Sequence, residues 1–286
     1  MEQTMIKGIL FDWDGSIVPQ GGSIDPKVAQ FLRFLHGLGI KMGPATGKNA
    51  DYMRGVASGI GISMWDYVVG ESGAFLLRLI EAGPPPVFET ICLSSDGQES
   101  LSLFRYHARI DQIKRTLWVR GRQVSYRPEL KEMILTLFPP DKDISVTEEW
   151  VLYFEEIIKT HRLNLKVQRH PDGCIDIVPI GISKGNGVLM VCKLLECKPE
   201  NILTVVDGSN DRELADGTTA IAVGNANQDI KDLVTQQGGY VAEYLDGLGF
   251  MEGVFWFATR NAFGELSGKI VEYFKDPENV PLSMRQ

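Results

Sequence analysis

The stretch GILFDWDGSIV, from Gly8 to Val18, places two aspartates directly after an apolar run. Residues Lys7 to Phe11 are continuously apolar after the lysine, as expected for a strand that is covered on both faces. Aspartate is disfavoured inside strands, and two carboxylates in three residues repel one another. A polar turn would account for Asp12 and Asp14, so their role depends on what else the fold brings to this strand end.

Strands and helices alternate after this first strand. Asp25 followed by Pro26 predicts a helix start, because aspartate is a good N-cap and proline suits the first helical position. The segment IKMGPAT predicts a second strand that ends at Thr46, followed by a helix from about Asn49 to Ser58 and a short strand at Tyr67–Val69. This order is typical of a parallel sheet with crossover helices.

The alternation breaks at the proline-rich stretch EAGPPPV, Glu81 to Val87, which predicts a stiff connector and a domain boundary. From there to about Pro179, segments that favour strands are mixed with segments that favour helices. We expect strands in VFETICLS, TLWVRGRQVSY and GCIDIVP, and amphipathic helices in PELKEMILTLF and EEWVLYFEEIIKTH. Residues 82–179 are therefore predicted to form a separate α+β domain.

The first pattern returns at Ser183. The segments SKGNGVLMVCKLLE, NDRELAD and NQDIKDLVTQQ predict helices, and NILTVVD, TAIAVG and YVA predict strands, with GLGFMEGVFWFA as a last helix. Residues 1–81 and 180–286 are thus expected to form one discontinuous domain. Its fold class is α/β, with a doubly wound, Rossmann-like parallel sheet that the α+β domain interrupts.

Composition narrows the classes of partner. The 286 residues are 44% hydrophobic and 23% charged, with a net charge of −8, which suits a soluble globular protein. No Lys/Arg run predicts a nucleic-acid surface, and no apolar stretch has the length of a signal peptide or a membrane span. The four cysteines, which lack CxxC spacing, are expected to be reduced thiols in the cytoplasm.

Polar residues gather where the predicted parallel strands end, which is the edge at which such sheets bind ligands. They are Asp12, Asp14, Thr46, Asp207 and Asp211, with Lys184 at the start of a helix. Carboxylates this close raise one another's pKa unless a cation offsets them. Hard oxygen ligands of this kind suit Mg²⁺, which keeps several waters and binds substrate phosphate.

The same edge also suits an anion. The turns Asp14-Gly15-Ser16 and Thr46-Gly47 can point backbone N–H groups into a common hollow, and Lys184 adds positive charge. An aspartate that faces a phosphorus centre is a known nucleophile, and a second carboxyl group can move the proton. The sequence therefore predicts phosphoryl transfer at this edge.

Four motifs in order, DWDGS, ATG, SKGNG and VDGSND, resemble those of the haloacid dehalogenase-like phosphatase superfamily. The later AVGNA (Ala222 to Ala226) and the position of the inserted domain resemble the Cof-type branch, with its sucrose-phosphatase-like, mannosyl-3-phosphoglycerate-phosphatase-like and archaeal phosphoglycolate-phosphatase-like members. The resemblance covers the two core segments and implies that residues 82–179 are a cap domain.

The resemblance implies a role for each matching residue. Asp12 would be the nucleophile and a Mg²⁺ ligand, and Asp14 the general acid/base, whose backbone carbonyl also binds the metal. The phosphoryl group would be held by Thr46, Gly47 and Lys184, with Asn210 beside it. Asp207 would bind Mg²⁺ directly, and Asp211 would bind it or orient its waters. Ser16 for threonine, Lys48 for arginine and Val206 for glycine are departures from the common pattern.

Residues outside the motifs are candidates for substrate specificity. Arg120, Arg122 and Arg127 cluster in the predicted cap and could bind a carboxylate or a distal phosphate, although a solvated strand face explains them equally well. Glu71 precedes Ser72-Gly73, where relatives show a Glu-Asn-Gly loop near the site, so we expect it on the substrate side.

The expected function is Mg²⁺-dependent hydrolysis of a small phosphorylated metabolite, a sugar phosphate or a phosphoglycolate-like acid, through an aspartyl-phosphate. A phosphomannomutase-like phosphotransferase and a non-catalytic metabolite-binding protein are the alternatives. We expect no nucleic-acid or membrane partner, and the sequence fits a monomer and a homodimer equally.

Overall fold

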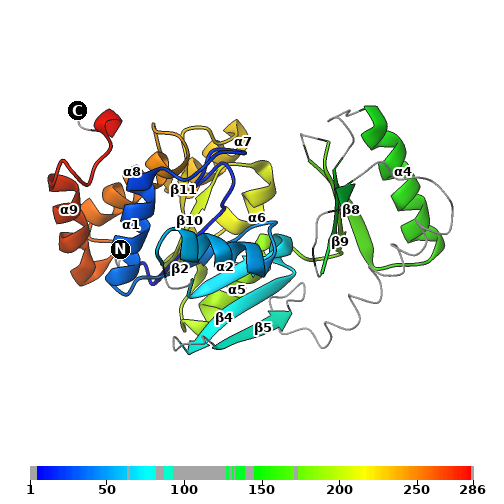
Figure 1. Cartoon of the computed structure of the whole chain (residues 1–286), viewed down its shortest axis with the longest axis horizontal. Coiled ribbons are helices and arrows are strands. Elements are labelled where there is room, and N and C mark those ends of the chain that lie inside the picture. Colours follow the sequence, from blue (N-terminus) through cyan, green and yellow to red (C-terminus); the bar gives the residue numbers. More distant parts are fainter. Residues whose placement is uncertain are drawn as a thin grey trace.

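The computed structural model describes residues 5–62, 65–81, 87–92, 127–128, 131, 133–138, 145–170 and 173–284. Figure 1 shows a larger part, in which helices surround a sheet, and a smaller part built from a second sheet and the helix α4 (Ser145–Thr160). Each part has its own cluster of buried apolar side chains.

The larger part is organised by a sheet of five parallel strands in the order β12-β11-β10-β1-β2. The strands are β1 (Gly8–Phe11), β2 (Lys41–Pro44), β10 (Ile202–Val206), β11 (Thr219–Ala222) and β12 (Tyr240–Val241). The first strand lies between β10 and β2, and Phe11 is level with both Val205 and Pro44. The carboxyl ends of three strands therefore meet around the residue that follows Phe11. The predicted doubly wound α/β fold is confirmed.

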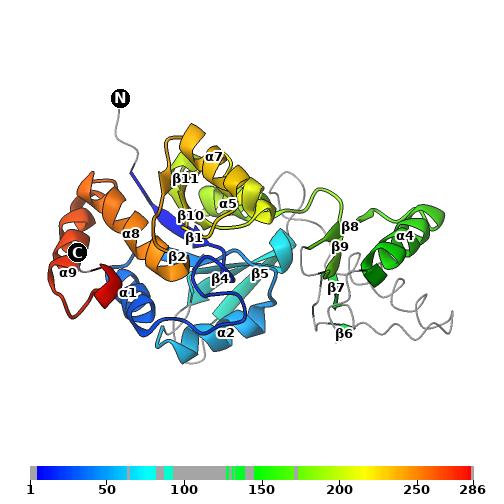
Figure 2. The same ribbon diagram turned by 90° about the horizontal axis from the view of Figure 1, so that it is seen from above.

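Helices cover both faces of this sheet (Figure 2). On one face lie α1 (Pro26–Gly37), α8 (Asp246–Thr259) and α9 (Ser267–Lys275); on the other lie α5 (Lys184–Leu194), α6 (Arg212–Ala215) and α7 (Gln228–Gln236). The ring of Phe250 joins the first face to the sheet, because its centroid lies 6.3 Å from that of Phe11 and 5.7 Å from that of Phe31. We expected α8 to be the last helix, and α9 shows that this was wrong.

The first helix begins where its capping residues predict. Asp25 accepts a hydrogen bond from the backbone N–H of Lys27 at 2.7 Å, and Pro26 is the first helical residue. The side chains that it buries are Val28, Ala29, Phe31, Leu32 and Leu35. The helix α2 (Ala50–Gly59) likewise begins after its N-cap residue, Asn49, which accepts from the N–H of Tyr52 at 2.8 Å.

A third strand extends the structure beyond β2. The strand β3 (Tyr67–Gly70) forms one parallel bridge with the residue after β2, between Ala45 and Val69. A Cβ added to Gly43 would lie 1.7 Å from the carbonyl oxygen of Tyr67, so only glycine allows this approach. Because Thr46 immediately follows Ala45, the bridge also fixes the start of the Thr46 turn.

The strand β3 pairs antiparallel with β4 (Phe75–Glu81), which in turn pairs with β5 (Val87–Cys92). Ile91 of β5 joins the larger apolar cluster. This strand lies within residues 82–179, yet it is paired with residues of the preceding segment. The division into a core of 1–81 and 180–286 and a cap of 82–179 stays a prediction.

The second sheet has the order β6-β7-β9-β8 and is antiparallel. Its strands are β6 (Arg127–Pro128), β7 (Leu135–Phe138), β8 (Leu165–Arg169) and β9 (Ile175–Pro179). Alternate residues of β7 and β9 pack with buried residues of α4. The helix predicted in PELKEMILTLF is therefore wrong for residues 135–138, whereas the helix and the strand predicted in EEWVLYFEEIIKTH and GCIDIVP are confirmed.

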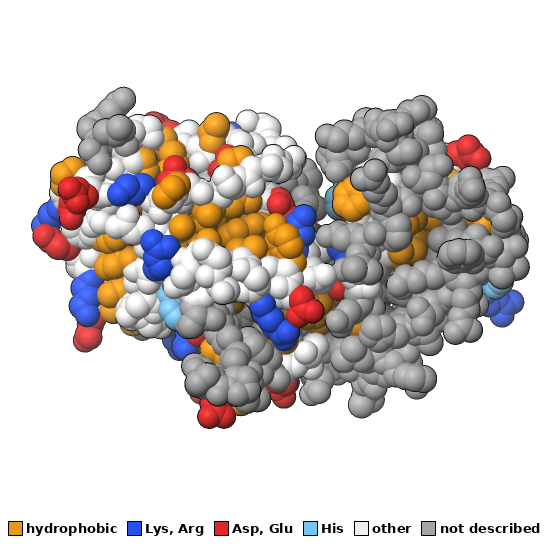
Figure 3. Space-filling model, in the orientation of Figure 1, with side chains coloured by type: hydrophobic (Ala, Val, Ile, Leu, Met, Phe, Trp, Pro, Cys, Tyr) orange, Lys and Arg blue, Asp and Glu red, His pale blue; other side chains and the backbone are white. Residues whose placement is uncertain are grey.

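Three further observations concern the surface, the helices and the cysteines. On the face that Figure 3 shows, hydrophobic side chains gather between α1 and α2, with charged side chains around them. Within the described ranges, no helix combines the length and the apolarity needed to cross a bilayer. Cys174, Cys192 and Cys197 are free thiols.

Candidate active site at the carboxyl edge of the sheet

The residues after β1 form a tight loop that holds Asp12 at the centre of the edge. The backbone N–H of Asp12 still donates to the sheet, to the carbonyl of Val205 at 2.9 Å, and its side chain is buried. The N–H of Gly15 then donates to the carbonyl of Val18 at 2.7 Å, which closes the loop. Gly15 has φ +90°, and a Cβ there would lie 2.3 Å from an Asp207 carboxylate oxygen.

Asp207 and Asp211 are fixed against this loop by hydrogen bonds. The hydroxyl of Ser16 donates to Asp207 Oδ1 at 3.0 Å, which orients that carboxylate toward the first strand. Asp211 is fully buried, and its Oδ2 lies 3.3 Å from the N–H of Gly208, at the start of the turn that leads into α6. The two carboxylates that follow β10 are thereby brought next to Asp12.

Lys184 connects two of these carboxylates. Its Nζ lies 2.6 Å from Asp12 Oδ1 and 2.6 Å from Asp211 Oδ1, and its side chain is 4% exposed. It is the first residue of α5, which Asn186 caps by accepting from the N–H of Ser183 at 2.7 Å. A cation at a helix N-terminus is opposed by the helix dipole, so the two carboxylates are what stabilise it there.

The electrostatics of the site are those of crowded carboxylates. Burial, followed by repulsion from Asp211, raises the pKa of Asp12 well above its usual value, although Lys184 acts in the opposite direction. Burial and Asp211 likewise raise the pKa of Asp207 to about 6. Burial opposes the charge of Lys184, but Asp12 and Asp211 outweigh it and raise the lysine pKa. One buried lysine thus leaves negative charge uncompensated.

This acidic cluster fits a divalent cation. Asp12, Asp207 and Asp211 each offer a carboxylate oxygen, and these oxygens lie within 4.8 Å of one another. Three hard oxygen donors with excess negative charge suit a cation of the Mg²⁺ type. A second group with metal-ligand chemistry, His170, Cys174 and Asp176, lies in the smaller part.

The second group is already balanced by protein groups. Asp176 contacts His170 Nε2 at 3.0 Å, accepts a hydrogen bond from Thr136, and lies 3.9 Å from Lys131 Nζ. Burial opposes its ionisation, but His170 and Lys131 lower the pKa of Asp176 below its ordinary value. Its negative charge is therefore matched within the sheet, and the Asp12 cluster is the stronger candidate for a metal site.

The Thr46 turn follows β2 at the same edge of the sheet, and the backbone N–H of Thr46 donates to the carbonyl of Val69 at 2.9 Å. Thr46 is buried, and its hydroxyl oxygen accepts from the N–H of Lys48 at 3.2 Å. The ammonium group of Lys48 lies 3.5 Å from Asp14 Oδ2 and over the ring of Tyr52. The side chains of Asp14 and Lys48 are 38% and 30% exposed, so Asp14, unlike Asp12, faces solvent.

The remaining predicted residues divide into three groups. Asn210 joins the site, since its amide nitrogen lies 3.4 Å from Asp211 Oδ1, although the residue is exposed. Glu71 is fully buried, and backbone N–H groups of residues 133 and 134 donate to its carboxylate. Arg120 and Arg122 lie outside the described residues, as does the side chain of Arg127, whose backbone begins β6.

Asn225 is a residue that we did not assign to the site from the sequence. Its amide nitrogen donates to the carbonyl of Gly15 at 2.7 Å, and its amide oxygen accepts from the N–H of Asp246 at 2.7 Å. Asn225 thereby links the loop after β1 to the start of α8. The available signal was its place in AVGNA, directly after β11, where the side chain reaches the carboxyl edge.

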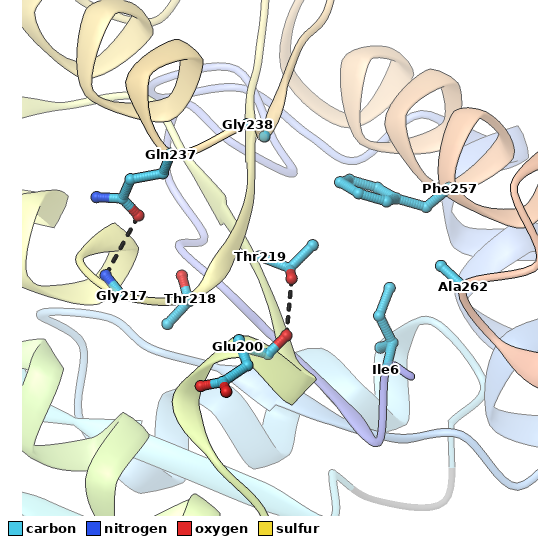
Figure 4. A pocket seen from close by; sticks show the side chains of 10 residues that line it. Ile6, Glu200, Gly217, Thr218, Thr219, Gln237, Gly238, Phe257 and Ala262 are labelled. Atoms are coloured by element: carbon cyan, nitrogen blue, oxygen red, sulfur yellow. Dashed lines mark hydrogen bonds between the residues drawn. The ribbon is translucent and has the colours of Figure 1, made fainter. Parts of the chain in front are cut away.

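Another hollow lies at the opposite edge of the sheet, where the strands begin. This pocket has a volume of about 460 Å³ (Figure 4). Its polar side chains include Thr219, which donates to the carbonyl of Glu200 at 2.7 Å, and Gln237, which accepts from the N–H of Gly217 at 3.2 Å. Because these groups are engaged with the backbone, the acidic edge is the better candidate for catalysis.

Known proteins were compared with this chain by sequence and by fold. The model of the haloacid dehalogenase-like hydrolase family matches residues 128–249, a range that holds Lys184, Asp207 and Asp211. A phosphoglycolate phosphatase of Methanopyrus kandleri is 24% identical over 257 residues, which are 83% of this chain and 94% of that protein.

Solved structures share the fold at lower identity. A Thermoplasma acidophilum protein superposes with a TM-score of 0.61 at 15% identity and covers 95% of this chain and 99% of its own. The sucrose-phosphatase of Synechocystis, solved with sucrose and phosphate, gives a TM-score of 0.58 at 16% identity, with 88% of this chain and 98% of its own covered. Both likenesses extend over almost the whole of those chains.

Proposed function

Because this chain belongs to the haloacid dehalogenase-like phosphatases, we propose that it is a Mg²⁺-dependent phosphatase of a small phosphorylated metabolite. The substrate class is a sugar phosphate or a phosphoglycolate-like acid. The observation that carries the proposal is the buried Asp12 carboxylate, held 2.6 Å from Lys184 beside Asp207 and Asp211. The proposed nucleophile therefore lies next to the lysine ammonium group and to the carboxylates that would bind a metal ion.

Asp12 is the nucleophile in this proposal. One of its carboxylate oxygens attacks phosphorus, and the bond from phosphorus to the leaving oxygen breaks, which leaves an aspartyl-phosphate on Asp12. Lys184 shields the negative charge of Asp12 as the phosphate approaches, because its ammonium group is already in contact. Thr46, Gly47 and Asn210 donate to the oxygens of the phosphoryl group.

Asp14 moves the protons. It gives its proton to the leaving oxygen, and then takes one from the water that attacks the phosphorus of the aspartyl-phosphate. That attack releases inorganic phosphate and restores the Asp12 carboxylate. The exposed position of Asp14 supports this role, because proton exchange with solvent and contact with a leaving group both need access. Lys48, at 3.5 Å, holds its carboxylate on this side of the loop.

Asp12, Asp207 and Asp211 would hold Mg²⁺ through their carboxylates, and Asp14 would contribute its backbone carbonyl. The bound ion would withdraw negative charge from the phosphoryl oxygens. The raised pKa values of Asp12 and Asp207 support this assignment, because they reflect burial of the two carboxylates first and then repulsion from Asp211, which the protein itself does not fully offset.

The substrate class is tested by a panel of phosphorylated metabolites incubated with Mg²⁺, with released inorganic phosphate as the readout. The panel includes phosphoglycolate and sucrose phosphate, the substrates that the names of two similar proteins indicate. Isomerised sugar phosphate without free phosphate would overturn the hydrolase in favour of a phosphotransferase.

The nucleophile is tested by the substitution Asp12→Asn. We expect turnover to fall by about a thousandfold or more, with the fold retained, since attack on phosphorus needs the carboxylate. The matched control is Asp66→Asn, which makes the same change in a carboxylate that pairs with Lys41 at 2.8 Å, away from the cluster. Substantial activity in Asp12→Asn would rule the mechanism out.

A further inference from the structure

Three residues between β3 and β4, Glu71–Gly73, contact the loop that holds the proposed phosphate ligand. The N–H of Glu71 donates to the carbonyl of Lys48 at 3.0 Å, and the N–H of Ser72 donates to the carbonyl of Thr46 at 3.0 Å. These two backbone hydrogen bonds fix both ends of the short Thr46–Lys48 turn.

The side chain of Glu71 reaches in another direction, toward the smaller part of the molecule. Its Oε2 accepts from the N–H of Met133 at 2.6 Å and from the N–H of Ile134 at 3.0 Å. Glu71, Met133 and Ile134 are all buried, and residues 133 and 134 lead directly into β7. Hydrogen bonds from backbone N–H groups to a buried carboxylate are charge-assisted and strong.

Gly73 places the same turn in contact with the start of α5, which carries Lys184. A Cβ on Gly73 would lie 1.9 Å from the carbonyl oxygen of Ser183 and 2.9 Å from the nitrogen of Lys184. Gly73 also has φ +94°, so glycine is required there for two reasons. The turn therefore touches the start of the helix that carries Lys184.

The backbone of this turn is strained. Glu71 has φ 47° and Ser72 has φ 59°, in the left-handed region that side chains other than glycine rarely adopt. Such a conformation persists where the surroundings determine it from several sides, and it is concentrated at functional sites. Here the three contacts are with residues 46–48, residues 133–134 and the start of α5.

We propose that Glu71 is a positioning residue of the phosphatase. Its carboxylate connects residues 133–134, which precede β7, to the turn at residues 46–48. This connection keeps Thr46 and Lys184 in position to bind phosphate. The assignment of Thr46 and Lys184 as phosphate ligands rests on the proposed function. We expected Glu71 on the substrate side; the geometry instead gives its carboxylate a role in holding two backbone segments together.

The test compares Glu71→Ala and Glu71→Gln with the wild-type protein. The first readout is amide hydrogen exchange in the peptide that contains Met133 and Ile134, which we expect Glu71→Ala to accelerate about 10- to 100-fold. The second is calorimetric affinity for inorganic phosphate with Mg²⁺, expected to fall about tenfold. Glutamine keeps an acceptor oxygen but loses the negative charge that strengthens both hydrogen bonds, so Glu71→Gln should show a smaller but measurable loss in both readouts.

The control variant is Thr218→Val, which removes a buried hydroxyl that lies 2.7 Å from that of Thr204 and donates to the carbonyl of Ala215, beside the pocket at the edge where the strands begin. It should leave both readouts at wild-type values. Equal phosphate affinity in Glu71→Ala and the wild type would overturn the proposal, and so would an equal loss in Thr218→Val. If Glu71→Ala does not fold, the exchange rate and phosphate affinity of Glu71→Gln decide, and unchanged values for both overturn it.

Phosphate affinity and exchange are measured without turnover, so the proposed function is tested separately. A wild-type protein that binds phosphate but hydrolyses no member of the metabolite panel would contradict the phosphatase assignment. The loss of phosphate affinity in Glu71→Ala would still support the tie between the two segments.

Discussion

Replacing Asp207 by asparagine should stabilise the metal-free protein at about pH 8, although the substitution removes a charged group from the proposed active site. The asparagine side chain has the same shape, and its Oδ1 can still accept the hydrogen bond from Ser16 that the structure has at 3.0 Å. What it removes is a carboxylate that is partly buried and close to Asp211. Burial, followed by that repulsion, raises the pKa of Asp207 to about 6.

The size and the sign of the effect follow from this pKa. Raising it from 3.8 to about 6 corresponds to roughly 3 kcal/mol of folding free energy lost at high pH, since each tenfold change in proton affinity is worth about 1.4 kcal/mol. Solvent on the exposed side of Asp207 reduces this to about 2 kcal/mol. Because the folded state binds the proton more tightly, stability falls as the pH rises from about 4 to 6.

The assay is urea unfolding with EDTA from about pH 4.5 to pH 8. We expect Asp207→Asn to exceed the wild type by about 2 kcal/mol at the upper end, and the difference to shrink to about 1 kcal/mol at the lower end, which is still above the pKa of an unfolded aspartate. With Mg²⁺ the order should reverse, because an ion bound only by the folded wild type stabilises it. Asp66→Asn is the matched control and should show no such gain.

Two outcomes would refute this reasoning. If Asp207→Asn is less stable than the wild type at about pH 8 in EDTA, carboxylate crowding does not destabilise the site. If its advantage is the same at every pH, the gain comes from something other than the proton on Asp207.

Two further substitutions have outcomes that the structure fixes. Lys184→Met should abolish turnover. It should also lower the unfolding free energy in EDTA at about pH 8 by about 3–5 kcal/mol, because Asp12 and Asp211 stay buried without their cation. An unfolding free energy equal to that of the wild type would contradict the buried contacts. Ser72→Asn should raise the unfolding free energy by about 0.5 kcal/mol without loss of activity, because asparagine tolerates φ 59° better than serine. A melting temperature below that of the wild type would contradict the strain inferred at Ser72.

The central sheet was predictable because each of its features is local. Apolar runs predicted the strands, and capping residues such as Asp25 predicted the helix starts. Ligands bind at the carboxyl ends of parallel strands, and this rule predicted that Asp12 and Asp207 lie close together. Asn225 shows the limit of that rule. It follows β11 at the same edge, but its partner is the carbonyl of Gly15, and a backbone acceptor has no signature in the sequence.

The strand β7 was missed for the opposite reason. Its residues and those before it include good helix formers such as Leu, Lys, Glu and Met, so local preference favoured a helix in residues 128–138. The pairing of Thr136 with Asp176 decides otherwise. Leu135 and Leu137 then point to the apolar cluster under α4, an alternation that only the partner strand reveals. The contact of Glu71 with Met133, 62 residues apart, is non-local in the same way.

The clustered carboxylates bear on the chemistry as well as on stability. A protonated Asp12 cannot attack phosphorus, so a raised pKa by itself would make a poor nucleophile near neutral pH. Lys184 favours the ionised form but is shared with Asp211, so it cannot neutralise the cluster alone. A divalent cation would complete the neutralisation and favour ionised Asp12 in the same step that prepares the phosphate site. In the proposed mechanism, the instability expected of the metal-free edge and the need for a metal ion therefore have one cause.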